Sequence, residues 1–153
     1  MRAAMLTLAG YHAWATEVLF ETVEGLDDAR YRADVGLFFR SVHGTLNHLL
    51  VADHVWYGRC IDVPFSVAGL DSELEAERGA LARALRAATA RWSTWLATLD
   101  DARLAGTLVY RNMSGAAFEQ PLTSLLLHVF NHATHHRGQI SAALTQAGLA
   151  APE

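Results

Sequence analysis

Scarce residue types exclude several classes of protein for this 153-residue chain. Its one cysteine, Cys60, cannot form a disulfide within the chain, so nothing indicates an oxidising compartment. No apolar run approaches the roughly 20 residues that a membrane span needs. The N-terminus enters an amphipathic pattern directly, without the separate apolar segment of a signal peptide. We therefore expect a cytoplasmic protein without membrane association, in which Cys60 is a small apolar residue.

Positive charge is also in short supply. The chain has twelve Lys and Arg against sixteen Asp and Glu, a net charge of −4, and its basic residues are scattered. Because a nucleic-acid-binding protein concentrates positive charge on one surface, no nucleic-acid partner is expected. Prolines number only three, no low-complexity tract is present, and 52% of the residues are hydrophobic. This composition and length predict one compact domain spanning residues 1–153.

Apolar residues recur every three or four positions in four long segments, a pattern typical of amphipathic helices. The predicted helices cover residues 1–23, 37–59, 71–99 and 121–147. The first is expected to bury Ala4, Leu8, Tyr11, Ala15, Val18, Leu19 and Thr22. The second is expected to bury Phe38, Val42, Thr45, Leu49, Ala52 and Trp56. Four such helices predict an all-α fold, a four-helix bundle.

The pattern changes between the third and fourth predicted helices. Residues 107–111 and 116–120 flank a turn-forming cluster at 112–115. We therefore expect a small hairpin or an extended insert before the last helix. Pro121 suits the first position of that helix, and Gly148 suits its end.

Four of the eight histidines lie close together in the last predicted helix. At ~100° per residue, His132 and His136 fall on its apolar stripe, one turn apart, so both imidazoles can reach one ion. By the same rotation His48 lies at the edge of the stripe of the second helix. His43 and His54 fall on nearly the opposite face of that helix, where surface positions are expected.

The histidine pair of the last helix has two interpretations. It can be a hydrogen-bonded core pair or a partly exposed pair, but buried neutral imidazoles would need polar partners among Leu, Val and Ile side chains. A cation supplies the electrophile that their nitrogens lack. We therefore predict a divalent metal ion held by His48, His132 and His136. Three neutral nitrogen ligands without a thiolate suit Zn²⁺ or Ni²⁺, and three protein ligands leave a position open, as in catalytic zinc sites.

Groups around these ligands are expected to orient the imidazole rings. The candidates are backbone carbonyls, Asn131, Gln139 and Asp53, with His128 and His135 at flanking positions. For Asp53, an ion pair with a buried arginine such as Arg137 is an equally good interpretation.

Three segments of the chain resemble the DinB/YfiT-like family of metalloenzymes. They are YHAWA at 11–15, LNHLLVADHVW at 46–56 and HVFNHATHHRGQI at 128–140, and the last is the most specific. The resemblance implies an up-down-down-up four-helix bundle, commonly a homodimer. It also implies a divalent metal held by one histidine of the second helix and an HxxxH pair of the last, which by position are again His48, His132 and His136. His12 and Thr16 stand where the family often has asparagine.

Family members with an assigned activity are thiol-dependent S-transferases and isomerases that use bacillithiol, mycothiol or glutathione. The resemblance therefore implies a low-molecular-weight thiol and a small-molecule substrate. One hypothesis is a metal-dependent enzyme, an S-transferase or a related hydrolase or isomerase, whose open metal position binds a thiolate or generates hydroxide. The other is a non-catalytic metal-binding stress-response or scaffold protein, without a substrate cavity. Aromatic residues that could line a substrate pocket, or belong to the core, are Trp14, Trp56, Tyr110 and Phe118.

Overall fold

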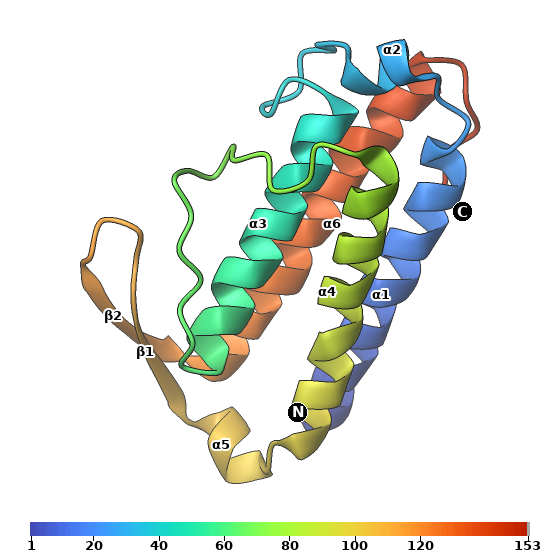
Figure 1. Ribbon diagram of the computed structural model, residues 1–153. Coiled ribbons are helices and arrows are strands. Elements are labelled where there is room, and N and C mark those ends of the chain that lie inside the picture. Colours follow the sequence, from blue (N-terminus) through green and yellow to red (C-terminus); the bar gives the residue numbers. More distant parts are fainter. Residues whose placement is uncertain (153) are drawn as a thin grey trace.

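Four long helices dominate the computed structural model, which describes residues 1–152 (Figure 1). They are α1 (Arg2–Val23), α3 (Val42–Cys60), α4 (Arg78–Thr98) and α6 (Leu122–Gln146). The connections contain two short helices and two strands: α2 (Asp28–Arg32), α5 (Asp101–Ala105), β1 (Thr107–Arg111) and β2 (Ala117–Pro121). The predicted all-α four-helix bundle with a hairpin before the last helix is confirmed.

The four long helices run up, down, down and up (Figure 1). Both α1 and α3 pack against α4 and α6, so α1 and α3 occupy opposite corners of the bundle. The connection between α3 and α4, residues 61–77, returns along the length of the bundle. This long return makes α3 and α4 parallel, as the resemblance implies.

The start of α3 lies at Val42, later than the apolar pattern predicts. Gly36 and Arg40 have positive φ angles of 76° and 69°, which a continuous right-handed helix cannot contain. Ser41 then caps the helix by accepting a hydrogen bond from a backbone amide of the first turn. The predicted burial of Phe38 is wrong, because this residue precedes the helix and is 82% exposed.

The start of α4 is also later than predicted, at Arg78, because a buried amide holds the preceding segment in an extended path. Asn47 on α3 accepts hydrogen bonds from the backbone N–H groups of Leu74 and Glu75 at 2.8 and 3.0 Å. Its Nδ2 donates to the carbonyl of Glu75 at 3.1 Å. These bonds satisfy the backbone groups of residues 74 and 75 outside a helix. The helix begins where Glu77 accepts from the next free amides.

The buried face of α1 is rotated from the predicted stripe. Tyr11, expected in the core, is 45% exposed, whereas the neighbouring His12 is 4% exposed. The buried residues of α1 are Met5, Ala9, His12, Ala15, Thr16, Leu19, Phe20 and Val23. Hydrophobicity alone misplaces this face because His12 finds polar partners inside the bundle, described below.

Two hydrophobic clusters hold the helices together, one toward each end of the bundle. The cluster near α2 includes Leu46 and Ile140, and the cluster near α5 includes Trp92 and Leu126, all fully buried. Burial of each such side chain contributes about 1.5–3 kcal/mol. Polar residues of α1, α3 and α6 lie at the level between the clusters, where apolar packing on both sides fixes their positions.

The predicted hairpin is confirmed: β1 and β2 are antiparallel, and Tyr110 lies opposite Phe118 with their ring centroids 5.6 Å apart. Asn112 shapes the turn by accepting hydrogen bonds from two backbone amides with its side chain. The hairpin projects from one end of the bundle (Figure 1). A hydrogen bond of 3.0 Å from the amide of Leu122 to the carbonyl of Gly106 joins its two ends.

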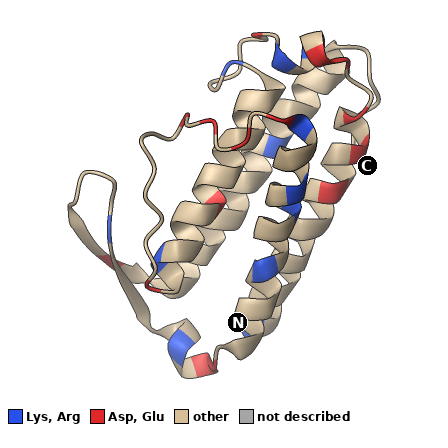
Figure 2. Ribbon diagram, in the orientation of Figure 1, with Lys and Arg blue, Asp and Glu red and all other residues tan. Residues whose placement is uncertain are grey.

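Acidic residues and arginines are interspersed over the fold (Figure 2). All twelve basic residues are arginines, and six of them form ion pairs with Asp or Glu in the part of the chain that the structure describes. Half of the positive charge is therefore neutralised locally. Among residues 1–152, no helix combines the length and the apolarity needed to cross a bilayer.

Candidate metal centre

Three histidines from two helices meet in the middle of the bundle, and we refer to them as the histidine triad. His48 projects from α3, and His132 and His136 project from α6. The Nε2 atom of His132 lies 3.2 Å from Nε2 of His48 and 3.1 Å from Nε2 of His136. His48 and His136 are buried and His132 is half-buried. The structure therefore brings together the three histidines that the sequence pattern selects.

Two of the imidazole rings are oriented by hydrogen bonds at Nδ1, the nitrogen that points away from the centre of the triad. Nδ1 of His48 lies 2.8 Å from the carbonyl oxygen of Leu70 in the connection 61–77, and a carbonyl can only accept. Nδ1 of His136 lies 2.8 Å from Oε1 of Gln139, one turn along α6. Both rings therefore carry their proton on Nδ1, so their Nε2 lone pairs point into the centre. Phe39 stacks on His48 with ring centroids 3.8 Å apart, which further fixes that ring.

The environment keeps these rings neutral. Burial lowers the pKa of His48 to about 4 and that of His132 to about 3, and it also lowers the pKa of His136. For His132, the proximity of His136 and His48 lowers the pKa further. Near neutral pH the triad is therefore a set of uncharged nitrogen donors.

The donor set fits a divalent cation. A proton on Nε2 of His132 could satisfy only one of its two neighbours, whereas a cation satisfies all three lone pairs at once. With metal–nitrogen distances of about 2.0–2.1 Å, ligand nitrogens lie about 2.9 Å apart at right angles and about 3.3 Å apart in a tetrahedron. The two Nε2–Nε2 separations, 3.1 and 3.2 Å, fall between these values.

No fourth ligand of the His, Cys, Asp or Glu type joins the triad within the described residues. Cys60 lies at the far end of α3, is buried, and has its pKa raised to about 12 by that burial. A thiol of this kind neither ligates readily nor acts as a nucleophile. The prediction that Cys60 behaves as a small apolar residue agrees with its place in a hydrophobic cluster.

Asp53 forms a second polar cluster next to the triad, and its partner differs from the predicted one. Oδ1 of Asp53 lies 2.9 Å from Nη2 of Arg91, and the indole N–H of Trp92 lies 3.1 Å from both carboxylate oxygens. Oδ2 lies 3.0 Å from Nε2 of His12. The suggested direct ion pair with Arg137 is wrong: Arg137 donates to Nδ1 of His12 at 2.8 Å and reaches Asp53 only through that ring. We call these five residues the Asp53 cluster.

The Asp53 cluster fixes the tautomer of His12. Because Arg137 can only donate, Nδ1 of His12 must accept, so its proton is on Nε2 and is donated to Asp53. Sequence reasoning did not assign His12 a role. The signal that could have found it is Arg137, because no acidic residue lies on α6 to pair with this arginine. Such an arginine needs a partner on another helix, and His12 on the buried side of α1 is that partner.

A very small cavity separates the Asp53 cluster from the triad. It is lined by His12 and Asp53 on one side and by His132 on the other, with Trp56 beside them. Its volume is about 10 Å³, close to the space that a single water molecule needs. The two polar clusters are therefore neighbours without a direct hydrogen bond between them.

The remaining histidines separate by exposure. His128 and His135 are exposed on α6, with rings 5.6 and 5.0 Å from those of His132 and His136, which agrees with flanking positions. The predicted role of Asn131 in orienting a ligand ring is wrong: Asn131 is exposed, and within the described residues it forms no side-chain hydrogen bond with a histidine of the triad. The predicted surface position of His43 is wrong.

His43 is 6% exposed because polar groups outside α3 reach it. The hydroxyl of Tyr31 lies 3.1 Å from its Nδ1, and Oε1 of Glu73 lies 2.6 Å from its Nε2. His54 is half-buried, stacked on Phe65 with ring centroids 4.8 Å apart. In both cases a segment outside the helix covers a side chain that the helical periodicity places on the surface.

Comparison with known proteins adds three findings. The sequence model of the DinB family matches residues 1–153. Protein DinB of Bacillus subtilis (strain 168) is 28% identical over 146 residues, which covers 92% of this chain and 84% of that protein. The structure of YfiT from Bacillus subtilis, described as a probable metal-dependent hydrolase with an unusual four-helix bundle topology, matches with a TM-score of 0.66 at 15% identity.

The YfiT match covers 96% of this chain and 87% of that one, so the two proteins share their fold over nearly their whole length. The family match likewise leaves no part of the sequence outside it. On the strength of this full-length match, the chain belongs to the DinB family.

Proposed function

We propose that this protein is a divalent-metal-dependent enzyme acting on small molecules, with the ion held by His48, His132 and His136. The observation that supports it is the convergence of three neutral Nε2 atoms, two of them on rings oriented through Nδ1 by Leu70 and Gln139. Nitrogen donors without a thiolate favour Zn²⁺ or Ni²⁺. A bound ion of this kind supplies Lewis acidity and lowers the pKa of a coordinated water or thiol.

The proposed reaction is transfer of a low-molecular-weight thiol to a small electrophile, with hydrolysis or isomerisation as related possibilities. The chain offers no activated thiol of its own, since Cys60 is buried with a raised pKa. A thiol nucleophile therefore comes from outside the protein, and water is the nucleophile for hydrolysis. The description of the YfiT structure as a probable metal-dependent hydrolase supports the same general chemistry.

The alternative, a non-catalytic metal-binding stress-response or scaffold protein, would be favoured by a closed metal site. Among residues 1–152, however, no fourth His, Cys, Asp or Glu ligand closes it. Structural zinc sites normally have four protein ligands, whereas catalytic sites keep one position for water or substrate. The count of three therefore favours the enzyme.

Elemental analysis of the untagged protein after reconstitution with Zn²⁺ or Ni²⁺ tests the metal site. We expect about one ion per chain, as for a three-histidine site, and loss of most of it in His132→Ala and His136→Ala. The matched controls are His128→Ala and His135→Ala, which remove exposed histidines from the same helix. Equal metal content in all four variants would rule out the triad as the site.

A thiol-consumption assay tests the reaction. Metal-loaded protein is incubated with glutathione, bacillithiol or mycothiol and a panel of small electrophiles, alongside a panel of esters and amides for hydrolysis. We expect turnover of at least one pair by the wild type and none by His132→Ala. Full metal binding without turnover of any substrate would favour the non-catalytic alternative.

We also propose that the protein is a cytoplasmic homodimer. An exposed aromatic pair on α1 supports a subunit contact: Tyr11 and Trp14 are 45% and 55% exposed, with ring centroids 5.6 Å apart. Large exposed aromatic residues are enriched at interfaces. Light scattering should give twice the chain mass for the wild type and a lower mass for Trp14→Ser, with Met113→Ser, another exposed apolar residue, unchanged.

A further inference from the structure

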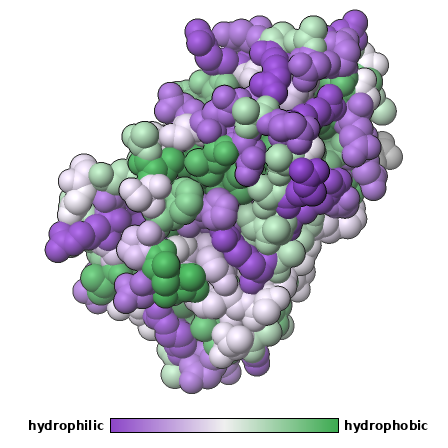
Figure 3. All heavy atoms as spheres, in the orientation of Figure 1, coloured by the Kyte–Doolittle hydropathy of each residue, from purple (hydrophilic) through white to green (hydrophobic). Residues whose placement is uncertain are grey.

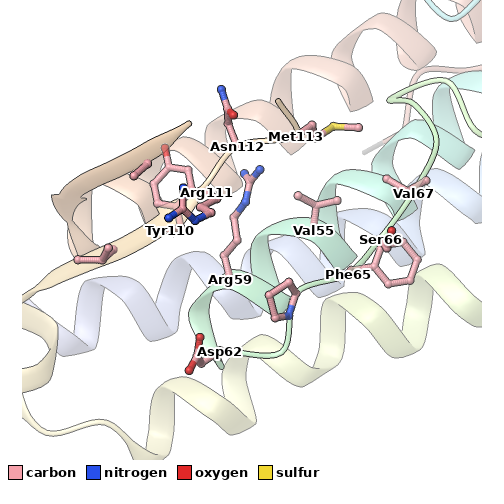
Figure 4. Close-up of a pocket in the computed structure, with 13 residues that line it drawn as sticks. Val55, Arg59, Asp62, Phe65, Ser66, Val67, Tyr110, Arg111, Asn112 and Met113 are labelled. Atoms are coloured by element: carbon pink, nitrogen blue, oxygen red, sulfur yellow. The ribbon is translucent and has the colours of Figure 1, made fainter. Parts of the chain in front are cut away.

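A cavity of about 560 Å³ opens between the end of α3, the connection 61–77 and the β-hairpin (Figure 4). Val55 and Arg59 line it from α3, Phe65 and Val67 from the connection, and Met113 from the hairpin turn. Hydrophobic residues gather along the connection on this face of the molecule (Figure 3). The volume falls within the roughly 300–1,000 Å³ of small-molecule sites.

The guanidinium group of Arg59 is held in this cavity by two aromatic rings. Its Cζ atom lies 4.5 Å from the ring centroid of Trp56 and 4.8 Å from that of Tyr110. In the described part of the chain, Arg59 forms no ion pair and no side-chain hydrogen bond, unlike the six paired arginines. Stacking leaves the edge of the guanidinium, where its N–H donors lie, free to meet a ligand.

The other charged groups of the cavity leave it with an excess of positive charge. Figure 4 shows Arg59 extending from α3 toward the hairpin residues, while Asp62 points the other way. Arg111 also lines the cavity and donates one hydrogen bond, of 2.8 Å, to the carbonyl of Gly115. The cavity lining therefore contains two guanidinium groups and one carboxylate, and that carboxylate points away from Arg59.

We infer that this cavity binds a small organic carboxylate, with its carboxylate on Arg59 and its apolar part against Val55, Phe65 and Met113. A planar, pre-positioned guanidinium matches a carboxylate with two parallel hydrogen bonds. The lining has two arginines and one aspartate, a net charge of +1, which matches a singly charged carboxylate better than a doubly charged phosphate. Trp56 and Tyr110, which the sequence suggested as pocket residues, act here by positioning Arg59.

The cavity lies about two turns of α3 from the histidine triad, and no residue of the triad lines it. Val55 is seven residues from His48 on the same face of α3, about 10 Å along the helix. The connection that contributes Val67 to the cavity holds His48 through Leu70 three residues later. If the proposed function holds, the carboxylate is part of the substrate. Binding at Arg59 itself requires no metal, so the two proposals can fail separately.

Calorimetric titration with benzoate and its neutral analogue benzamide tests the inference, on metal-free and zinc-loaded protein. We expect benzoate to bind both forms, with benzamide at least about tenfold weaker, as for a charge-assisted pair. Arg59→Gln should remove the preference for benzoate and Arg59→Lys should keep part of it. The matched control is Arg83→Gln, since Arg83 is exposed and lies on α4 away from the cavity.

Equal affinity for benzoate and benzamide, or an unchanged preference in Arg59→Gln, would overturn the inference. Tighter binding of phenylphosphonate than of benzoate would overturn the choice of a carboxylate. If Arg59→Gln does not fold by circular dichroism, Met113→Trp replaces it: this variant fills the cavity and should weaken both ligands at least tenfold. Normal zinc binding without benzoate binding would refute only the cavity ligand, and benzoate binding without zinc binding would refute only the metal proposal.

Discussion

The Asp53 cluster and the histidine triad are neighbours in the middle of the bundle, yet their polar atoms are satisfied in different ways. In the Asp53 cluster the carboxylate receives N–H groups from Arg91, Trp92 and His12, and donors and acceptors alternate along the chain of contacts. In the triad, three Nε2 atoms face one another, and a proton on His132 can serve only one of its two neighbours. A network that is complete within the chain stabilises the fold, whereas an incomplete one at the same depth has room for a group from outside.

Removing the carboxylate of Asp53 should produce the largest loss of stability. Asp53→Ala leaves Arg91 without its anion and Trp92 and His12 without their acceptor, because all three depend on one side chain. We expect the free energy of unfolding in urea to fall by about 3 kcal/mol. The control Asp101→Ala, at an exposed acid that forms no ion pair in the described residues, should change it by less than about 0.5 kcal/mol. Similar losses in both would mean that the Asp53 cluster does not stabilise the bundle.

The triad should contribute stability only together with its ion. Zinc at a hundred times its dissociation constant should raise the stability of the wild type by about 2.7 kcal/mol, seen as a higher Tm. In His132→Ala this increment should disappear, while the metal-free stability changes much less than in Asp53→Ala. His128→Ala should behave like the wild type. A large metal-free loss in His132→Ala would show that the triad is a structural network after all.

A smaller effect is expected when the orientation of one ring is lost. Gln139→Leu removes the acceptor for the Nδ1 proton of His136 and should weaken zinc binding roughly 10–100-fold. Gln139→Glu keeps an oxygen acceptor and should retain most of the affinity. Competition with a chromophoric chelator measures both, with Gln146→Leu as an exposed control on the same helix. Equal affinity in Gln139→Leu would mean that the ring needs no such support.

The smallest expected effect is on the pH dependence of the metal-free protein. The pKa of His48 is about 4 and that of His132 about 3 in the folded state, below the ordinary value of about 6.5. As pH falls below about 6.5 the unfolded chain binds protons first, so the stability present above that pH is progressively lost toward pH 4. Thermal scans should show Tm falling by a few degrees from pH 7 to pH 6. The fall should be shallower in His132→Ala, and an equal slope would contradict the pKa shifts.

The same contrast explains which parts of the molecule could be predicted from the sequence. The triad was found because His48, His132 and His136 lie well inside long regular helices, where a rotation of 100° per residue holds. His43 and Phe38 were misplaced because segments outside the helix decide their surroundings: Tyr31 and Glu73 cover His43, and positive φ angles delay the start of α3 until after Phe38.

Contacts between helices are harder to predict. No spacing rule says that α4 lies beside α3, so Arg91 could not be identified as the partner of Asp53. The same holds for Asn47, whose hydrogen bonds to Leu74 and Glu75 shift the start of α4. Periodicity within one helix thus locates a site, while the hydrogen-bond partners between elements depend on the tertiary packing.

The bond that joins the two ends of the hairpin has a consequence for engineering. Because the amide of Leu122 meets the carbonyl of Gly106, the strands leave and re-enter the bundle at almost one point. Longer or shorter hairpins can therefore be exchanged at this point as a cassette, at a small cost in loop-closure entropy. Libraries built in residues 107–121 would reshape one wall of the cavity while every residue of the triad and of the Asp53 cluster stays in place.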